Sequence, residues 1–293
     1  MFDKVASLAR PSAGARSALA PIGGFDSGVG GLSVLRAIRQ ALPSHPLLYV
    51  ADTAYAPYGD RSAGFIEDRA RVIAHHLVKE GAQALVVACN TASVHACKSL
   101  RAQYSIPVVA IEPAIKPATA MTKTGVIGVL ATSQTLASAS VARLCANFGS
   151  HCRIMLQACP GLADQVDKGE LDSPATRAML QRYLEPLRGA GADVLVLGCT
   201  HYPFLSPIIQ AMVGPEVTLL DPAAAVAREL VNRLRLTSQD AFAHASPAPD
   251  NDSAGDGAFA LGQTRFLTSG PVSGTENVLS LLWGAPVRLE AMA

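Results

Sequence analysis

Short apolar runs alternate with longer amphipathic stretches along the whole chain of 293 residues. Each apolar run ends in a polar or Gly-rich turn, which is typical of a buried strand, whereas the stretches between the runs repeat their apolar residues at helical spacing. We expect strands at residues 21–25, 47–51, 84–88, 107–111, 125–131, 153–157, 193–198, 217–221 and 264–268. We expect helices over residues 31–42, 62–81, 92–103, 113–123, 134–148, 173–190, 204–213 and 223–236, and a closing helix and strand within 277–287.

This alternation predicts an α/β fold with mainly parallel sheets that are covered by helices on both faces. A weak internal repeat indicates two pseudo-symmetric α/β domains. The segment that begins at Ile22 resembles the one that begins at Ile127, an offset of 105, and the runs that end at Cys89 and Cys199 are offset by 110. A third pair of strands lies near an offset of 107. Equivalent strand ends would then face each other across a cleft, and because open α/β sheets bind ligands at such ends, we expect the active site there.

The composition sets limits on the partners and the compartment. The formal net charge is only +1, so nucleic-acid binding has no electrostatic support. No apolar run is long enough for a membrane span. Residues 1–20 lack the continuous apolar segment of a signal peptide, and we interpret them as a flexible tail. Residues 238–263 are rich in Ala, Ser, Pro, Asp and Gly and predict a mobile loop. We expect a cytoplasmic protein.

Two of the six cysteines occupy matched settings, Cys89 after "LVVA" and Cys199 after "LVLG". Two thiols that face one ligand suit the inversion of a stereocentre with an acidic C–H. One thiolate removes the proton from one face, and the other thiol supplies a proton to the opposite face. The alternative for each is a buried small hydrophobic residue. We interpret the remaining four cysteines in that way (Cys97, Cys145, Cys152 and Cys159).

Polar and Gly-rich residues adjoin these strand ends. Asp26 and Ser27 follow the first strand in "GFDSGVGG", whose glycines allow a ligand to approach the backbone, although an ordinary tight turn has the same composition. His201 follows Cys199 closely and could assist it. Asn90-Thr91 and Thr200 could bind a ligand or simply cap a helix. No residue pattern indicates a cofactor, and neither the cysteines nor the histidines have metal-ligand spacing.

Five segments of the chain strongly resemble the cofactor-independent glutamate racemases of bacteria, and the similarity is clearest over residues 22–235. The segments are "FDSGVGGLSVLRAI" (25–38), "DTAYAPYGDRS" (52–62), "VVACNTAS" (86–93), "ACPGLADQVDKGEL" (158–171) and "LGCTHYPFL" (197–205). The resemblance implies an isomerase that interconverts L- and D-glutamate by two-base proton transfer and supplies D-glutamate for peptidoglycan. It implies no cofactor and no metal, and a homodimer.

The resemblance also implies roles for individual residues. Cys199 would deprotonate L-glutamate and Cys89 would deprotonate D-glutamate, with Asp26 and His201 as their assisting groups. Asp167 stands where the family often has Glu and would be an auxiliary group. The positions that line the substrate would be Asp26, Ser27, Pro57, Tyr58, Gly59, Asn90, Thr91, Thr132, Thr135, Thr200 and His201. The family's domains are discontinuous, which implies one domain of residues 21–113 plus 222–293 and another of 114–221.

Three alternatives remain at this stage. The chain could be a racemase of aspartate or a related amino acid, and the size of its pocket would decide this. It could be a non-catalytic binding or regulatory protein that kept the fold, although such a protein would be expected to have lost a cysteine or Asp26. It could also be a hydrolase with a single nucleophilic cysteine, which would not require Cys199.

Overall fold

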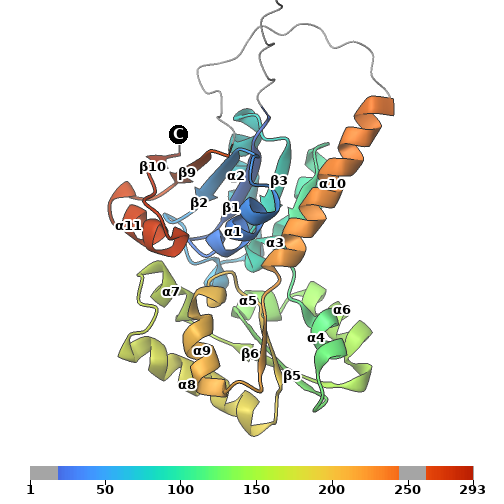
Figure 1. Ribbon diagram of the computed structural model, residues 1–293, viewed down its shortest axis with the longest axis vertical. Helices are drawn as coiled ribbons and strands as arrows, with labels where there is room; N and C mark the ends of the chain where they lie inside the picture. Colours follow the sequence, from blue (N-terminus) through green and yellow to red (C-terminus); the bar gives the residue numbers. More distant parts are fainter. Residues whose placement is uncertain (1–18, 244–261, 293) are drawn as a thin grey trace, which may run out of the picture.

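The computed structural model describes residues 19–243 and 262–292, which form two parallel sheets stacked end to end (Figure 1). The first sheet has the strand order β10-β9-β2-β1-β3-β4 and the second has the order β6-β5-β7-β8. The strands are β1 (Ile22–Asp26), β2 (Leu47–Ala51), β3 (Ala84–Val87), β4 (Val108–Ala110), β5 (Val126–Ala131), β6 (Arg153–Ala158), β7 (Val194–Leu197), β8 (Thr218–Leu220), β9 (Thr264–Thr268) and β10 (Leu289–Ala291). All of them except β10 lie at or near the expected positions, and the prediction of an α/β fold with parallel sheets is confirmed.

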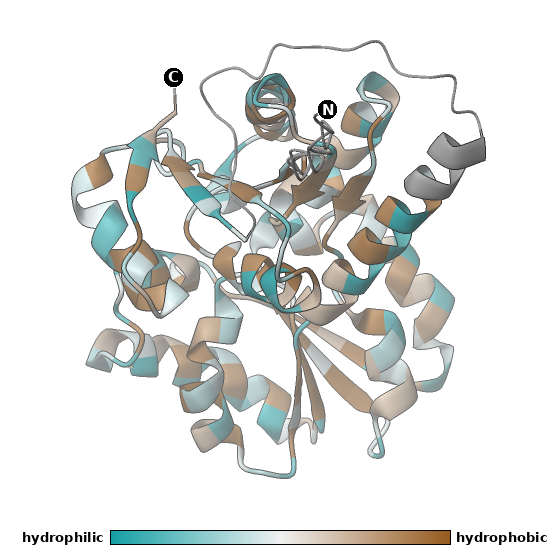
Figure 2. Cartoon of the chain, turned by 45° about the horizontal axis from the view of Figure 1, so that its top comes forward, coloured by the Kyte–Doolittle hydropathy of each residue, from teal (hydrophilic) through white to brown (hydrophobic). Residues whose placement is uncertain are grey.

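Helices cover both faces of the first sheet. Helices α1 (Leu32–Ala41), α10 (Ala223–Ala243) and α11 (Val272–Trp283) pack on one face, and α2 (Ala63–Lys79) and α3 (Asn90–Gln103) pack on the other. The alternation of side chains along a strand divides the apolar residues between these layers: Ile22 of β1 joins the first core cluster and Phe25 joins the second. Figure 2 shows the apolar strands between helices with mixed surfaces.

The second sheet has the same layering. Helices α4 (Ile115–Met121) and α6 (Ala139–Phe148) cover one face, and α7 (Leu162–Asp167), α8 (Pro174–Gly189) and α9 (Ser206–Val213) cover the other. One apolar cluster includes Leu35 of α1 as well as Leu184 of α8, so the core continues from one half of the molecule into the other.

The strand registers confirm the internal repeat. Ile22 pairs with Ala84 on one side and with Leu47 on the other. In the second sheet Ile127 pairs with Val194 and with Ile154 in the same arrangement. These pairs have the same sequence offsets that the repeat predicted, and β1, β2, β3 and β4 are therefore equivalent to β5, β6, β7 and β8.

The helices differ from the expectation at several places. The single helix expected over 134–148 is interrupted, because the Ser138 hydroxyl accepts a hydrogen bond from the Val141 N–H and starts a new helix after α5 (Ser133–Leu136). The short helix α7 was not expected. Helix α10 continues past 236 to Ala243, because no Gly or Pro interrupts it, so the segment expected to be a mobile loop begins as helix. The last strand, β10, lies beyond the expected 277–287. Most of the expected tail and loop lie outside the described residues.

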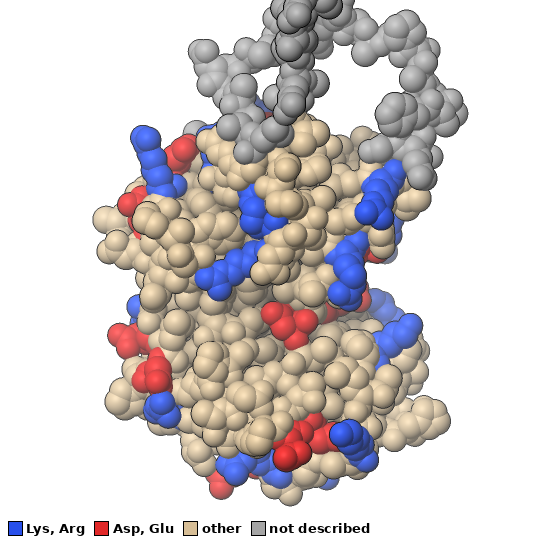
Figure 3. All heavy atoms as spheres, viewed as in Figure 1, with Lys and Arg blue, Asp and Glu red and all other residues tan. Residues whose placement is uncertain are grey.

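The surface agrees with the balanced composition. On the face drawn in Figure 3, acidic and basic side chains are scattered among wide uncharged areas. Within the described part of the chain, no helix is long and apolar enough to cross a membrane.

Candidate active site

Cys89 and Cys199 line one cavity between the two halves of the molecule. Cys89 lies just beyond the carboxyl end of β3 and Cys199 just beyond that of β7, which are equivalent strands. Both side chains are buried, at 4% and 6% exposure. The cavity has a volume of about 20 Å³, which is room for roughly one water molecule. The repeat therefore brings the two matched thiols to one enclosed space, as the sequence predicted.

Nearly all of the expected site residues line this cavity. Thr135 does not line it but lies directly behind, where its hydroxyl is 3.2 Å from that of Thr91. Ala163 was not among the expected residues, and it lines the cavity as well because the unexpected helix α7 carries it there. The lining residues are Asp26, Ser27, Pro57, Tyr58, Gly59, Cys89, Asn90, Thr91, Thr132, Ala163, Asp167, Cys199, Thr200 and His201.

The surroundings of Cys89 favour the protonated thiol. Its Sγ accepts a hydrogen bond from the Ala92 N–H at 3.4 Å at the start of α3, and a helix N-terminus stabilises a thiolate. Burial has the larger effect, however, and together with the Asp26 carboxylate it raises the pKa of Cys89 well above the usual 9.0. The Sγ atom also lies 3.7 Å from the Ser27 hydroxyl.

Asp26 connects the two halves at the centre of the site. Its carboxylate accepts hydrogen bonds from the Gly31 N–H at 2.6 Å and, across the cleft, from the Thr200 hydroxyl at 3.1 Å. Burial raises the pKa of Asp26 above its usual 3.8, although His201 and the neighbouring hydrogen-bond donors oppose this shift. A carboxyl group with a raised pKa beside a thiol is suited to exchange a proton with it.

Cys199 is the first member of a hydrogen-bonded chain of three side chains. Its Sγ lies 3.6 Å from Nδ1 of His201, and Nε2 of His201 lies 3.0 Å from Oδ1 of Asp167. Burial opposes ionisation of both partners, but their mutual attraction outweighs it, so the pKa of His201 is raised and that of Asp167 is lowered. Asp167 is therefore a carboxylate, and Nε2 must donate to it, which directs Nδ1 toward the sulfur.

The Gly-rich turn after β1 makes room for this chain. A Cβ atom on Gly30 would lie 2.2 Å from Nδ1 of His201, and one on Gly28 would lie 2.6 Å from Oδ1 of Asp167. The backbone N–H of Val29 in the same turn donates to Asp167 at 3.0 Å. The turn thus holds a histidine and a carboxylate from the other half, a function that its Gly-rich composition did not predict.

The cavity wall contains polar groups that are available to a ligand. Both amide atoms of the Asn90 side chain are buried without a hydrogen-bond partner, which is rare for a polar group inside a protein. The hydroxyls of Thr91, Thr132 and Thr135 lie within 3.0–3.2 Å of one another across the cleft. Among the described residues that line the cavity, none is Lys or Arg. A small ligand with carboxylate and ammonium groups would be bound by amides, hydroxyls and backbone groups.

Supporting residues were missed because they bear no chemical signature in the sequence. The hydroxyl of Ser33, on α1, donates to the backbone carbonyl of Thr200 at 2.9 Å and supports the turn that carries Cys199 and His201. Asp52 and Arg69 support the segment that carries Tyr58. Over residues 19–243 and 262–292, no group of three or more His, Cys, Asp or Glu side chains is arranged to hold a metal ion.

Comparison with known proteins agrees with this geometry. A family model described as Asp/Glu/Hydantoin racemase matches residues 22–230. The chain is 49% identical over 266 residues to the glutamate racemase of Ectopseudomonas mendocina (strain ymp), an alignment that covers 90% of this chain and 95% of that protein. It is 46% identical over 268 residues to the glutamate racemase of Pseudomonas aeruginosa strain PAO1, covering 91% and 95% of the two chains.

A solved structure gives the same result. The crystal structure of Escherichia coli glutamate racemase in complex with L-glutamate and the activator UDP-MurNAc-ala superposes with a TM-score of 0.79. The two chains are 32% identical, and the alignment covers 94% of this chain and 98% of that one. These matches confirm the resemblance to glutamate racemases that the sequence motifs indicated.

Proposed function

The chain belongs to the Asp/Glu/Hydantoin racemase family, and from this premise we propose that it is a glutamate racemase that interconverts L- and D-glutamate without a cofactor. The observation that carries the proposal is the pair of buried thiols, from equivalent strand ends, that line one cavity. Each has its own proton-accepting neighbour: Asp26 on the side of Cys89 and His201 on the side of Cys199.

The proposed reaction is a proton transfer by two bases. His201 holds the proton of Cys199 as an imidazolium whose Nδ1 faces the sulfur, and the Cys199 thiolate removes the α-proton of L-glutamate. The thiol of Cys89, which its surroundings keep protonated, donates a proton to the opposite face and forms D-glutamate. The reverse reaction exchanges these roles, with Asp26 as the acceptor for Cys89. Asp167 keeps the His201 ring oriented and stabilises its protonated form.

The substrate groups would be bound by neutral donors and by acceptors. The unpartnered Asn90 amide and the hydroxyls of Ser27 and Thr200 are suited to the α-amino and α-carboxylate groups. The cluster of Thr91, Thr132 and Thr135 and the backbone of Pro57–Gly59 are suited to the side-chain carboxylate. No Lys or Arg lines the described cavity, so the protonated His201 is the cation that faces the Cys199 thiolate.

The wider role follows from the activity. D-Glutamate made by this enzyme would supply peptidoglycan synthesis, and we place the enzyme in the cytoplasm as a homodimer. We further propose that residues 21–113 with 222–293 form one domain and residues 114–221 the other, with the substrate bound between them.

The test is proton NMR of the purified protein with L-glutamate in D₂O, together with circular dichroism of the substrate. Loss of optical activity accompanied by deuterium at Cα would support the proposal. Exchange with aspartate but not with glutamate would assign a related racemase activity, and no exchange with either would favour a binding protein. Pyridoxal phosphate or a metal chelator should not change the rate.

A further inference from the structure

The segment between β2 and α2 brings three residues to the cavity and contacts both halves of the molecule. Pro57, Tyr58 and Gly59 of this segment line the cavity that holds the two thiols. Gly59 lies so close to Thr132 of the other half that a Cβ atom there would be 3.2 Å from the threonine Cβ. The position of this segment therefore determines the shape of one wall of the site.

One arginine of α2 holds this segment. The guanidinium of Arg69 donates from Nε and Nη2 to the two oxygens of Asp52, at 3.0 and 2.8 Å. Its central carbon lies 3.7 Å from the centre of the Tyr55 ring. The Tyr58 hydroxyl donates to the same carboxylate at 2.5 Å. Asp52, Tyr55 and Tyr58 are thus all organised around the side chain of Arg69.

The same carboxylate adjoins the catalytic region. Asp52 is fully buried, while the Arg69 side chain is 14% exposed. The Asp52 backbone N–H donates to the backbone carbonyl of Asp26 at 3.0 Å. The Tyr58 ring belongs to the apolar cluster that also contains Cys89. Burial and Asp52 raise the pKa of Tyr58 above its usual value, so the phenol stays protonated and keeps donating.

We propose that Arg69 is a positioning residue of the racemase: through the Asp52 carboxylate it fixes the Pro57–Gly59 wall against which glutamate binds. This inference rests on the proposed function. Arg69 contacts none of the reacting atoms and acts only through the segment that it holds. A planar guanidinium is required, because it binds both carboxylate oxygens and stacks on the Tyr55 ring at the same time, whereas a lysine ammonium can do only one of these.

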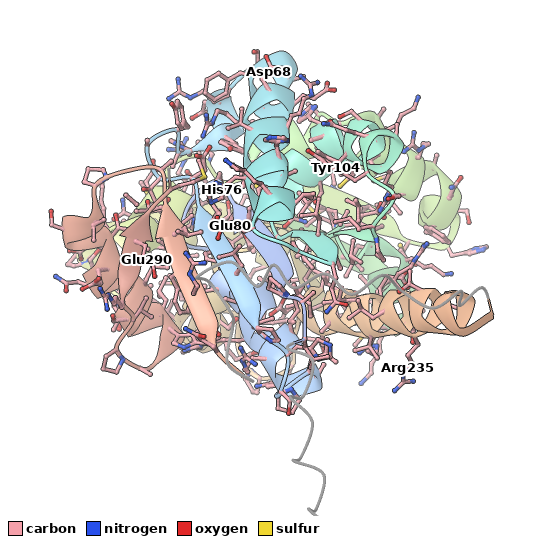
Figure 4. All side chains as sticks on the ribbon, turned by 90° about the horizontal axis from the view of Figure 1, so that it is seen from above. Asp68, His76, Glu80, Tyr104, Arg235 and Glu290 are labelled. Atoms are coloured by element: carbon pink, nitrogen blue, oxygen red, sulfur yellow. The ribbon has the colours of Figure 1, made fainter. Side chains whose placement is uncertain are left out.

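Figure 4 shows the setting of this contact, with α2 lying along the first sheet. Asp68, which precedes Arg69, lies near one end of the helix, and Glu80, just beyond the other end, lies on the side of Glu290. At that end Arg265 joins Glu80 to Glu290 through ion pairs. The cavity-side part of α2 therefore has its own anchor, separate from the ion pairs at the opposite end.

The test is the Arg69→Lys variant, with KM and kcat measured for both enantiomers and the melting temperature measured in parallel. A displaced wall weakens binding in both directions, so we expect KM to rise about tenfold for L- and D-glutamate, with kcat changed less than about threefold. L- and D-glutamate have equal free energies in solution, so kcat/KM must fall by the same factor in both directions. The double variant Arg69→Met with Asp52→Asn, which removes both charges, should recover stability but not KM.

The control is Arg71→Lys on the same helix, because Arg71 is exposed and forms ion pairs with Glu67 and Asp68 of its own helix. It should leave KM, kcat and the melting temperature unchanged. A normal KM in the Arg69→Lys enzyme would overturn the inference. This holds even if the variant is less stable, or if its kcat is lower because a smaller fraction of the protein is folded. If that variant does not fold, Tyr58→Phe, which keeps the ion pair, should raise KM, and an unchanged KM would overturn the inference equally. Failure of the unaltered protein to racemise glutamate would instead refute the proposed function, and this inference with it.

Discussion

At the scale of single residues, the two thiols have different neighbours, but both are required for racemisation. Each must act as base in one direction and as acid in the other, and a serine hydroxyl is far too weak an acid to replace either. We expect Cys89→Ser and Cys199→Ser each to lower racemisation by roughly 10²–10⁴-fold, measured by circular dichroism of the substrate. Cys152→Ser serves as the control, because Cys152 is partly exposed and does not line the cavity. Full activity in either cavity variant would rule out the two-base mechanism.

The ion pair of His201 and Asp167 makes a prediction about stability and pH. Because folding raises the pKa of His201, the protonated His201 stabilises the fold at pH values below 6.5, its usual pKa. This contribution is lost as the pH rises through the raised pKa. Because folding lowers the pKa of Asp167, its carboxylate stabilises the fold at pH values above 3.8, its usual pKa. This contribution is lost as the pH falls through the lowered pKa. Asp167→Asn should therefore lower the free energy of unfolding by about 1.5–3 kcal/mol between pH 4 and 6.5, and by less at high pH.

Urea unfolding of the Asp167→Asn variant and of the unaltered protein across this pH range measures the difference in their free energies of unfolding. Asp164→Asn is a suitable control, since Asp164 lies in the same short helix but outside the cavity that holds the thiols. If the difference in free energy of unfolding between Asp167→Asn and the unaltered protein grew with rising pH, it would contradict the assignment of a protonated His201 paired with an Asp167 carboxylate.

Some residues could be identified from the sequence and others could not, for a physical reason. Cys89 and Cys199 stand out because each follows a strand in a matched setting, and Asp167 was selected through the resemblance to the racemase family. Ser33 and Arg69 bear no such signal. Their roles arise from contacts with Thr200, 167 positions away, and with Asp52. Such contacts depend on the orientation of packed elements, which periodicity does not specify.

At the scale of elements, the turn between β1 and α1 must lack side chains where it meets the other half. We expect Gly30→Ala to displace His201 from Cys199, because the added Cβ would lie 2.2 Å from Nδ1, and to lower kcat/KM by about 10²-fold. Gly64→Ala is the matched control: nothing lies within 4 Å of a Cβ at that position of α2. It should keep full activity and gain roughly 0.5–1 kcal/mol of stability. Normal activity of Gly30→Ala would show that the His201 ring can move without cost.

The elements themselves were predicted unevenly. Strands are short and apolar and end in turn residues, so their positions were close to the structure. Helix α7 was missed because it spans only Leu162–Asp167 and follows Gly161, whose positive φ of 78° is typical of a turn. This omission mattered for the site, since α7 carries Ala163 and Asp167 to the cavity. The interruption between α5 and α6 was missed because Ser138 is compatible with a helix and starts a new one only through its cap.

At the scale of the whole molecule, the repeat explains how one cavity obtains two equivalent walls. The offsets between matched segments predicted that strand ends would face each other, and the shared registers confirm the repeat on which that prediction depended. The offsets could not predict the contacts that join the halves. Asp26 accepts from Thr200, and Val29 donates to Asp167, across the cleft. These bonds break the symmetry, since the equivalent positions in the other half are occupied by different residues.

The size of the cavity leads to a prediction about motion. A volume of about 20 Å³ is room for roughly one water molecule and is too small for an amino acid, so we expect the halves to separate when glutamate enters. The chain passes between them only twice in its described part, after β4 and after β8, and those two connections must accommodate the movement. Opening breaks the bond from the Val29 N–H to Asp167, which exposes that amide to solvent.

Hydrogen exchange measures this opening directly. Glutamate at about ten times its dissociation constant binds only when the halves close around it, so exchange in the peptide containing Val29 should slow by roughly tenfold. The peptide covering β5 is the control, because its amides lie inside the second sheet and do not depend on separation of the halves. Equal slowing in both peptides would indicate global stabilisation, and no slowing in either would mean that glutamate enters without separation of the halves. Slowing confined to the Val29 peptide would identify domain separation as a step of every turnover.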